Sequence, residues 1–393
     1  MHILLVADGR SPITRRWIQT LKVMEHQITL VSTYPCERPA EVDAMLVMPV
    51  AFASASGSQA GRKTGSRKGL IARFRPFFQS LRYRLGPLTL PRSGRQFARL
   101  VKEVTPDVVH AMRIPYEGML ASYTPAGIPL IISTWGNDLT LHAPATARMA
   151  ELTRKTLQRA DALMADCQRD IQLAQVWGFD AQKPSLKVVG NGGLDLMETD
   201  AIAAEVHRSE PLQILNPRGM RSYVRADTFF KAAALVHQTH PEVHFVCASM
   251  AGQPEAEQWV ESLKLTGAVS LLPFLDQAGL WREFARSAIS VSVTTHDGTP
   301  NTLLEAMAFG CLPVCGDIES IREWITPGVN GLLADPTDAH ALAGAIHLAI
   351  ESEELRRKAA RVNRELLEKR AEIHRVRAEL TRFYETFQKS RRF

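Results

Sequence analysis

The chain has 393 residues, of which 45% are hydrophobic and 22% are charged, and its net charge is +6. This composition fits a globular protein of about two domains and excludes a fibrous or wholly disordered chain. No apolar run is long enough to cross a bilayer as a helix, the first residues lack the pattern of a secretory signal, and five scattered cysteines do not form a disulfide framework. We therefore expect a cytoplasmic protein.

The first half of the chain alternates short apolar runs with helical stretches. Strands are predicted at 2–7, 27–32, 43–48, 107–111, 129–133, 161–165 and 186–190, and helices at 13–24, near 70–84 and at 94–103. This alternation predicts a parallel, doubly wound α/β sheet.

The positive charge is concentrated inside this first half. Residues 44–102 contain twelve Lys and Arg and no acidic residue, so the rest of the chain is net negative. Aromatic residues lie among these arginines, and that mixture is typical of segments that bind an anionic membrane surface. We expect residues 62–102 to contact the inner face of a membrane. A solvated loop remains an open alternative, and nucleic acid is the least favoured partner.

The alternation restarts after the polar stretch 199–211. Strands are predicted at 212–215, 243–248, 269–274 and 289–294, and helices at 227–237, 255–265, 277–287 and 300–309. We place the domains at 1–205, with a basic insertion at 53–102, and at 206–370, followed by a helix at 371–393 that packs back on the body. Two Rossmann-like domains in tandem place a ligand cleft between them.

The stretch 294–316 carries the most specific chemistry. It predicts a strand, a tight loop and a helix with Pro300 in its first turn, and a helix start exposes N–H groups that bind phosphate. Two carboxylates, Asp297 and Glu305, lie in the same stretch. A ligand that is part anion and part polyol, such as a nucleotide sugar, fits this combination. The alternative is that Asp297 caps the helix and Glu305 faces solvent.

Residues 297–310, which read Asp-Gly-Thr-Pro-Asn-Thr-Leu-Leu-Glu-Ala-Met-Ala-Phe-Gly, resemble the hallmark of retaining glycosyltransferase family 4, the group 1 glycosyltransferases. Residues 328–333 and 191–195 are similar to further motifs of that family. The resemblance implies a GT-B fold of two Rossmann-like domains. It also implies a metal-independent, retaining transfer of a sugar from a nucleotide-diphosphate sugar to an acceptor, which we expect to be a cell-envelope polysaccharide or a glycolipid.

The resemblance also implies roles for individual residues in the second domain. Asp297 would contact hydroxyls of the donor sugar, and Glu305 would hold the ribose. The backbone of five consecutive residues would meet the sugar and the diphosphate: Gly298, Thr299, Pro300, Asn301 and Thr302.

A basic pair would neutralise the leaving diphosphate in such an enzyme. Arg218 occupies the first position of the pair, and we favour Arg225 over Arg221 for the second. No metal ion and no cofactor other than the donor are expected.

The first domain departs from the family pattern. Its amino-terminal loop has one glycine, Gly9, where the family has a pair, and Trp135 replaces a histidine. Trp135 either stacks on a sugar or packs in the core. Asn137, Asp138 and His110 are the remaining acceptor-side candidates, although a structural role for His110 stays open.

Three other classes of protein remain as alternatives. A non-hydrolysing nucleotide-sugar epimerase has the same tandem architecture, and an inactive GT-B-like protein would bind its ligand without turnover. A nucleic-acid-binding protein would explain the basic segment but not residues 294–316. Cys311 and Cys315 lack further ligands in a zinc-like spacing, so we expect buried strand cysteines.

Overall fold

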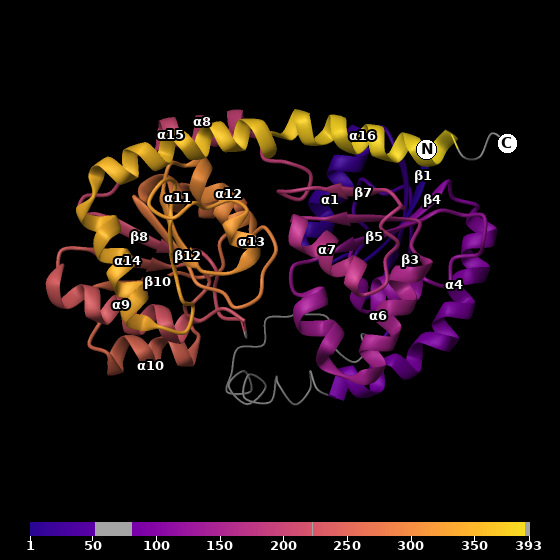
Figure 1. Ribbon diagram of the computed structural model, residues 1–393, viewed down its shortest axis with the longest axis horizontal. Helices are drawn as coiled ribbons and strands as arrows, with labels where there is room; N and C mark the ends of the chain where they lie inside the picture. Colours follow the sequence, from indigo (N-terminus) through magenta and orange to yellow (C-terminus); the bar gives the residue numbers. More distant parts are fainter. Residues whose placement is uncertain (52–80, 222, 390–393) are drawn as a thin grey trace. The chain divides into compact units, whose positions relative to one another are not determined.

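The computed structural model describes residues 1–51, 81–221 and 223–389 (Figure 1). It divides into two compact units. Unit 1 comprises Met1–Gly192 and Val376–Phe393, and unit 2 comprises Gly193–Arg375.

Unit 1 is built on a parallel seven-stranded sheet with the order β3-β2-β1-β4-β5-β6-β7. Its central strands are continuous apolar runs, as expected for strands covered on both faces. The strands are β1 (His2–Ala7), β2 (Gln27–Ser32), β3 (Ala44–Val47), β4 (Val108–Ala111), β5 (Leu130–Thr134), β6 (Ala162–Ala165) and β7 (Ser185–Lys187).

Helices connect these strands and cover the sheet (Figure 1). They are α1 (Pro12–Val23), α4 (Leu90–Val104), α5 (Met119–Ala121), α6 (Ala147–Arg159) and α7 (Gln168–Val176). The last helix of the chain, α16 (Ile373–Lys389), contributes most of its length to unit 1, where Tyr384 is fully buried.

Unit 2 is built on a parallel six-stranded sheet with the order β10-β9-β8-β11-β12-β13. Its strands are β8 (Gln213–Asn216), β9 (His244–Cys247), β10 (Val269–Leu271), β11 (Ile289–Ser292), β12 (Leu312–Gly316) and β13 (Leu332–Ala334). Its helices are α8 (Leu196–Glu205), α9 (Ala226–Thr239), α10 (Pro254–Ser262), α11 (Gln277–Arg286), α12 (Asn301–Ala308), α13 (Glu319–Arg322), α14 (Ala339–Glu351) and α15 (Glu353–Arg370).

Each sheet reverses its strand order once. In unit 1 the reversal lies between β1 and β4, and in unit 2 it lies between β8 and β11. In open parallel sheets, ligands bind outside the carboxyl ends of the strands at this switch point. The loops after β1 and β4, and those after β8 and β11, are therefore the places where each unit is built to hold a ligand.

The two parallel sheets confirm the predicted α/β class. The observed division at residue 192 differs from the predicted boundary at 205, because the polar stretch begins with the end of α8, which belongs to unit 2. The helix expected near 70–84 lies mostly outside the described residues. Cys311 and Cys315 are buried free thiols, as expected, and burial raises their pKa values to about 11 and about 12.

Candidate active site

An ion pair occupies the switch point of unit 2. Arg218 follows β8, Asp297 follows β11, and Nη2 of Arg218 lies 2.6 Å from Oδ2 of Asp297. The Arg218 side chain is 9% exposed and that of Asp297 is 18% exposed. The Nε–H of Arg218 is buried and has no hydrogen-bond partner among the described residues. Arginine has five donors, so Arg218 retains capacity for an additional acceptor.

The start of α12 lies beside this ion pair. Nη1 of Arg218 is 3.4 Å from Oγ1 of Thr302, in the first turn of the helix. The N–H groups of Asn301 and Thr302 have no intrahelical acceptor because no helical turn precedes them. An arginine and a helix amino terminus together form a place that favours an anion.

Two side chains that come later in the chain, Ser320 and Trp324, hold the loop before α12 in place. Ser320 donates to the backbone oxygen of Asp297 over 2.7 Å, and Nε1 of Trp324 donates to Oγ1 of Thr299 over 3.0 Å. Pro300 is the residue before the first helical one and makes no side-chain cap. Because the Asp297 carboxylate pairs with Arg218, the alternative that it serves only as a helix cap does not describe this loop.

Glu305 lies on α12 and is 6% exposed, which excludes the alternative that it faces solvent. Its Oε1 accepts a hydrogen bond of 2.7 Å from Nε2 of Gln277, at the start of α11. Gln277 was not predicted, and it holds the carboxylate in one orientation.

Arg225, the residue favoured for the second position of the basic pair, has a carboxylate partner of its own. Its guanidinium forms two hydrogen bonds of 2.8 and 2.7 Å with Asp227, at the start of α9, and this pairing raises the pKa of Arg225. Arg221 is exposed and contacts the hydroxyl of Tyr223. Arg218 is thus the arginine beside Asp297, and the second member of the basic pair stays a prediction.

In unit 1, Gly9 is required by packing. A Cβ atom at this position would lie 2.6 Å from Sγ of Cys36, closer than real Cβ contacts allow. Its N–H donates to Oγ of Ser32 over 3.2 Å, so the residue that follows β1 is held against the end of β2.

His110 was a candidate for contact with the acceptor, and its buried position does not fit that role. His110 is completely buried, its Nδ1 is 2.7 Å from the hydroxyl of Tyr384, and its Nε2 is 2.8 Å from Oγ of Ser133. Burial lowers its pKa to about 3. The imidazole is therefore a neutral internal link between β4, β5 and α16 and is not exposed to a substrate.

Asp138 is also completely buried, and its carboxylate organises the neighbouring loops. It accepts from the backbone N–H of Ile114 over 2.9 Å and of Trp135 over 3.2 Å, and it pairs with Nη2 of Arg113 over 2.6 Å. Asp138 is thus a positioning residue and not a group free to contact an acceptor. Asn137 lies next to it, with its Oδ1 3.5 Å from the same nitrogen of Arg113.

Trp135 is half-buried and supports a cation. The guanidinium carbon of Arg113 lies 4.8 Å from the centre of the Trp135 ring. The ring is thus not fully in the core, and it lines a small pocket together with Met112 and Ser133, so a stacking contact with a sugar stays a prediction.

Two residues that the sequence did not single out lie at the same switch point. Arg113 and Glu117 both follow β4, and Oε1 of Glu117 accepts from the backbone N–H of Asp8 over 3.0 Å. Glu117 is 5% exposed, and burial raises its pKa to about 8. The sequence could have indicated these two residues only through their position after a predicted strand at the switch point. Their local sequence pattern does not mark them as site residues.

Two family models match the chain. The model described as glycosyl transferases group 1 matches residues 198–366, and the model described as glycosyl transferase 4-like domain matches residues 9–192. The chain belongs to the group 1 glycosyltransferases. This result confirms the resemblance drawn from residues 297–310.

Solved structures of glycosyltransferases share the fold of this group 1 glycosyltransferase. A sucrose-phosphate synthase from Thermosynechococcus elongatus is 14% identical with a TM-score of 0.71, over 99% of this chain and 100% of that one. Anabaena HepE in complex with UDP and glucose is 16% identical with a TM-score of 0.69, over 98% and 100%. A glycosyltransferase from Rickettsia africae is 16% identical with a TM-score of 0.67, over 99% and 98%. These similarities confirm the GT-B fold. A search of curated proteins gives no match.

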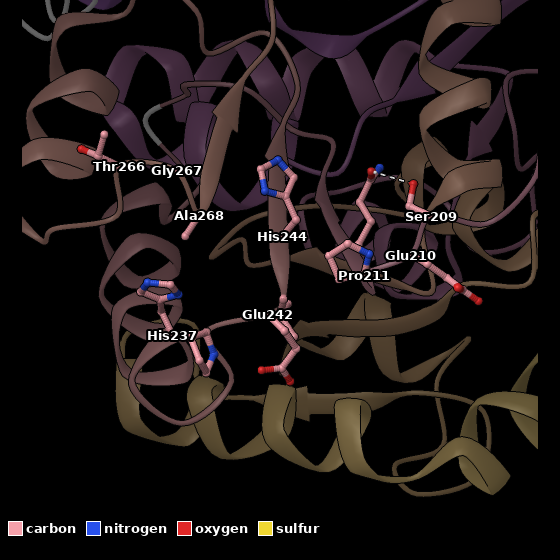
Figure 2. A pocket seen from close by; sticks show the side chains of 12 residues that line it. Ser209, Glu210, Pro211, His237, Glu242, His244, Thr266, Gly267 and Ala268 are labelled. Carbon is pink, nitrogen blue, oxygen red and sulfur yellow. Dashed lines mark hydrogen bonds between the residues drawn. The ribbon is translucent and has the colours of Figure 1, made fainter.

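A pocket in unit 2 of this glycosyltransferase lies away from Arg218 and Asp297. Figure 2 shows side chains that line this pocket, among them His237, Glu242 and His244. The pocket has a volume of about 450 Å³. These residues lie near the amino-terminal end of β9. Arg218 and Asp297 follow the carboxyl ends of their strands, so this pocket does not contain the predicted site residues.

In the part of the chain that the structure describes, two groups bring three potential metal ligands together. They are His240, His347 and Glu351, and Asp166, Cys167 and Asp170. Neither group includes Arg218, Asp297 or Glu305, so neither adds a metal ligand to the candidate site. None of the helices among the described residues is long and apolar enough to cross a membrane.

Proposed function

We propose that this protein is a retaining glycosyltransferase that transfers a sugar from a nucleotide-diphosphate sugar to a cell-envelope polysaccharide or glycolipid. The observation that carries the proposal is the Arg218–Asp297 ion pair beside the start of α12 and the buried Glu305. HepE, which shares the fold, has crystal structures in complex with UDP and glucose and in complex with UDP-glucose.

The residues of unit 2 suit a donor of this class. The diphosphate binds between Arg218 and the first N–H groups of α12, Asp297 accepts from hydroxyls of the donor sugar, and Glu305 accepts from the ribose. Carboxylates are strong acceptors for hydroxyl groups, and arginine matches the geometry of phosphate oxygens.

Catalysis then follows from where charge develops. As the bond between the anomeric carbon and the diphosphate breaks, negative charge grows on the leaving oxygens. In this proposal Arg218 and the dipole of α12, which lie close together, stabilise that charge. In this proposal these groups perform the work that a divalent cation performs in other transferases. The acceptor hydroxyl attacks from the face that the diphosphate leaves, so the anomeric configuration is retained.

We propose that unit 1 binds the acceptor and that residues 62–102 bring the enzyme to the inner face of the membrane. Their charge and aromatic content support this location. Binding to anionic vesicles at low salt, lost on deletion of residues 57–84, is the result expected.

Transfer itself is tested with nucleotide sugars and membrane extract, in EDTA and in Mg²⁺, with the product analysed by NMR. The proposal predicts transfer in both conditions, with retained configuration at the anomeric carbon. Turnover of the donor without any acceptor would instead indicate an epimerase, and binding without turnover would indicate an inactive relative.

A further inference from the structure

Three arginines gather around aromatic rings at the switch point of unit 1. The guanidinium carbon of Arg10 lies 3.8 Å from the centre of the Tyr34 ring, and that of Arg82 lies 5.6 Å from the same centre. Arg82 also lies 4.6 Å from the centre of the Tyr116 ring, and Arg113 lies 4.8 Å from that of Trp135, as described above. Aromatic faces hold these cations in place without neutralising their charge.

The backbone of unit 1 places these side chains at one edge of the sheet. Arg10 follows β1, Tyr34 follows β2, and Arg113 and Tyr116 follow β4. Tyr116 has a φ of 64°, which is uncommon for a residue with a side chain, and its hydroxyl donates to the backbone oxygen of Arg82 over 2.7 Å. Strained residues of this kind concentrate at functional sites.

The carboxylates at this edge leave the arginines with unused donors. Asp8 accepts from Nε and Nη2 of Arg10, each over 3.0 Å, and an ion pair at such an exposed position contributes little to stability. Asp138 is shared between Arg113 and two backbone N–H groups.

Arg82 has no carboxylate partner in the described part of the chain, and the Nε–H groups of both Arg82 and Arg113 are buried without a partner there. The third carboxylate of this edge, Glu117, has a pKa raised by burial to about 8, so it is mostly neutral at pH 7 and does not cancel the positive charge.

We propose that Arg10, Arg82 and Arg113 form a binding site for a phosphate group, and that the acceptor of this glycosyltransferase carries that phosphate. The inference rests on the proposed function for the role of acceptor, whereas the phosphate site is defined by unit 1 alone. Guanidinium groups bind phosphate with two parallel hydrogen bonds, and a neutral sugar does not need three of them. The phosphate belongs either to a lipid or to a soluble sugar phosphate.

The experiment uses the full chain saturated with whichever of UDP, GDP and ADP it binds, so that the anion site proposed in unit 2 is filled. Two probes are titrated by calorimetry and vesicle flotation: glycerol 3-phosphate, and phosphatidylcholine vesicles with or without phosphatidic acid. Arg82→Gln is compared with Arg84→Gln, which removes an exposed arginine from the same stretch of chain.

We expect Arg82→Gln to weaken binding of the phosphate probe at least tenfold without a change in melting temperature. Arg84→Gln should change the binding affinity less than twofold. Binding of glycerol 3-phosphate indicates that a soluble phosphate suffices, and binding of phosphatidic acid vesicles alone indicates a lipid. Equal losses in the two variants, or no binding of either probe, would overturn the inference.

Binding of the donor nucleotide is a separate outcome, which distinguishes a failure of the phosphate site from a failure of the proposed function. Nucleotide binding without phosphate binding leaves the proposed function intact and removes the phosphate site. Phosphate binding that depends on Arg82, in a protein that binds none of UDP, GDP and ADP, would keep the phosphate site and remove the proposed function.

Discussion

The two switch points have the same topology and different chemistry. In unit 2 the switch point holds one arginine, Arg218, paired with Asp297 beside a helix start. In unit 1 it holds arginines supported by aromatic rings, and the fully buried carboxylate of Asp138 pairs with one of them, Arg113. The sheet determines where a ligand binds, and the side chains after each strand determine which ligand it is.

The largest effect is expected from the buried carboxylate of unit 1. Asp138→Ala removes the partner of Arg113 and leaves two backbone N–H groups without an acceptor. Breaking a buried ion pair costs about 3–5 kcal/mol, so we expect a loss of that size in the free energy of unfolding measured in urea. Asp180→Ala, at an exposed position, serves as the control and should cost less than about 1 kcal/mol. Equal losses would mean that Asp138 does not organise these loops.

In unit 2 we expect the substitution of Arg218 to lower the rate of sugar transfer. Arg218→Gln removes the cation beside the start of α12, and the loss of one charge-stabilising donor lowers the rate of transfer by roughly 10²–10³. Arg322→Gln, whose side chain is 65% exposed, is the control and should keep the wild-type rate. We expect a smaller loss for Arg225→Gln because Asp227 holds that guanidinium. A larger loss for Arg225→Gln than for Arg218→Gln would reverse this assignment.

The buried acid of unit 1 predicts a dependence of stability on pH. The folded-state pKa of Glu117 is about 8, above its ordinary value of 4.5. The folded state therefore holds a proton that the unfolded state releases, and stability is lost as the pH rises from about 4.5 through 8. Compared with Glu117→Gln, the wild type should lose about 2 kcal/mol more between pH 6 and pH 7.5. Parallel stability curves for the two proteins would contradict a buried, protonated Glu117.

The smallest effect is expected at the internal histidine. Tyr384→Phe removes the hydroxyl that partners Nδ1 of His110 and should cost about 1–2 kcal/mol in thermal or urea unfolding. Tyr123→Phe is the matched control in the same unit and should change stability by less than about 0.5 kcal/mol. If Tyr384→Phe instead reduces transfer without changing stability, His110 acts in the reaction after all.

The sequence could place Asp297 and Glu305 beside one another because they are close together in the chain. Asp297 and Glu305 lie in one loop and the helix that follows, so local spacing alone places them at the end of a strand. Their partners were not predicted. Gln277 reaches Glu305 from a different helix, and the ion pair between Arg218 and Asp297 depends on β8 and β11 being neighbours.

The unit 1 site could not be predicted in the same way. Arg10, Arg82 and Arg113 come from three separate segments, and only the strand order brings them to one edge. His110 was placed at a strand end facing a ligand, but a helix more than 250 residues later covers it. Such long-range packing leaves no local signal in the sequence.

The central claim is that unit 2 binds a nucleotide diphosphate through Arg218, the start of α12 and Glu305. The most direct test is a melting-temperature series with UDP, GDP and ADP in EDTA, for the wild type, Glu305→Ala and the exposed control Glu257→Ala. At a ligand concentration of 100 times Kd, binding stabilises the folded state by about 2.7 kcal/mol. We predict a clear rise in melting temperature with one of the three nucleotides in the wild type and the control, and its loss in Glu305→Ala. No rise with any nucleotide, or an equal rise in all three proteins, would contradict the claim.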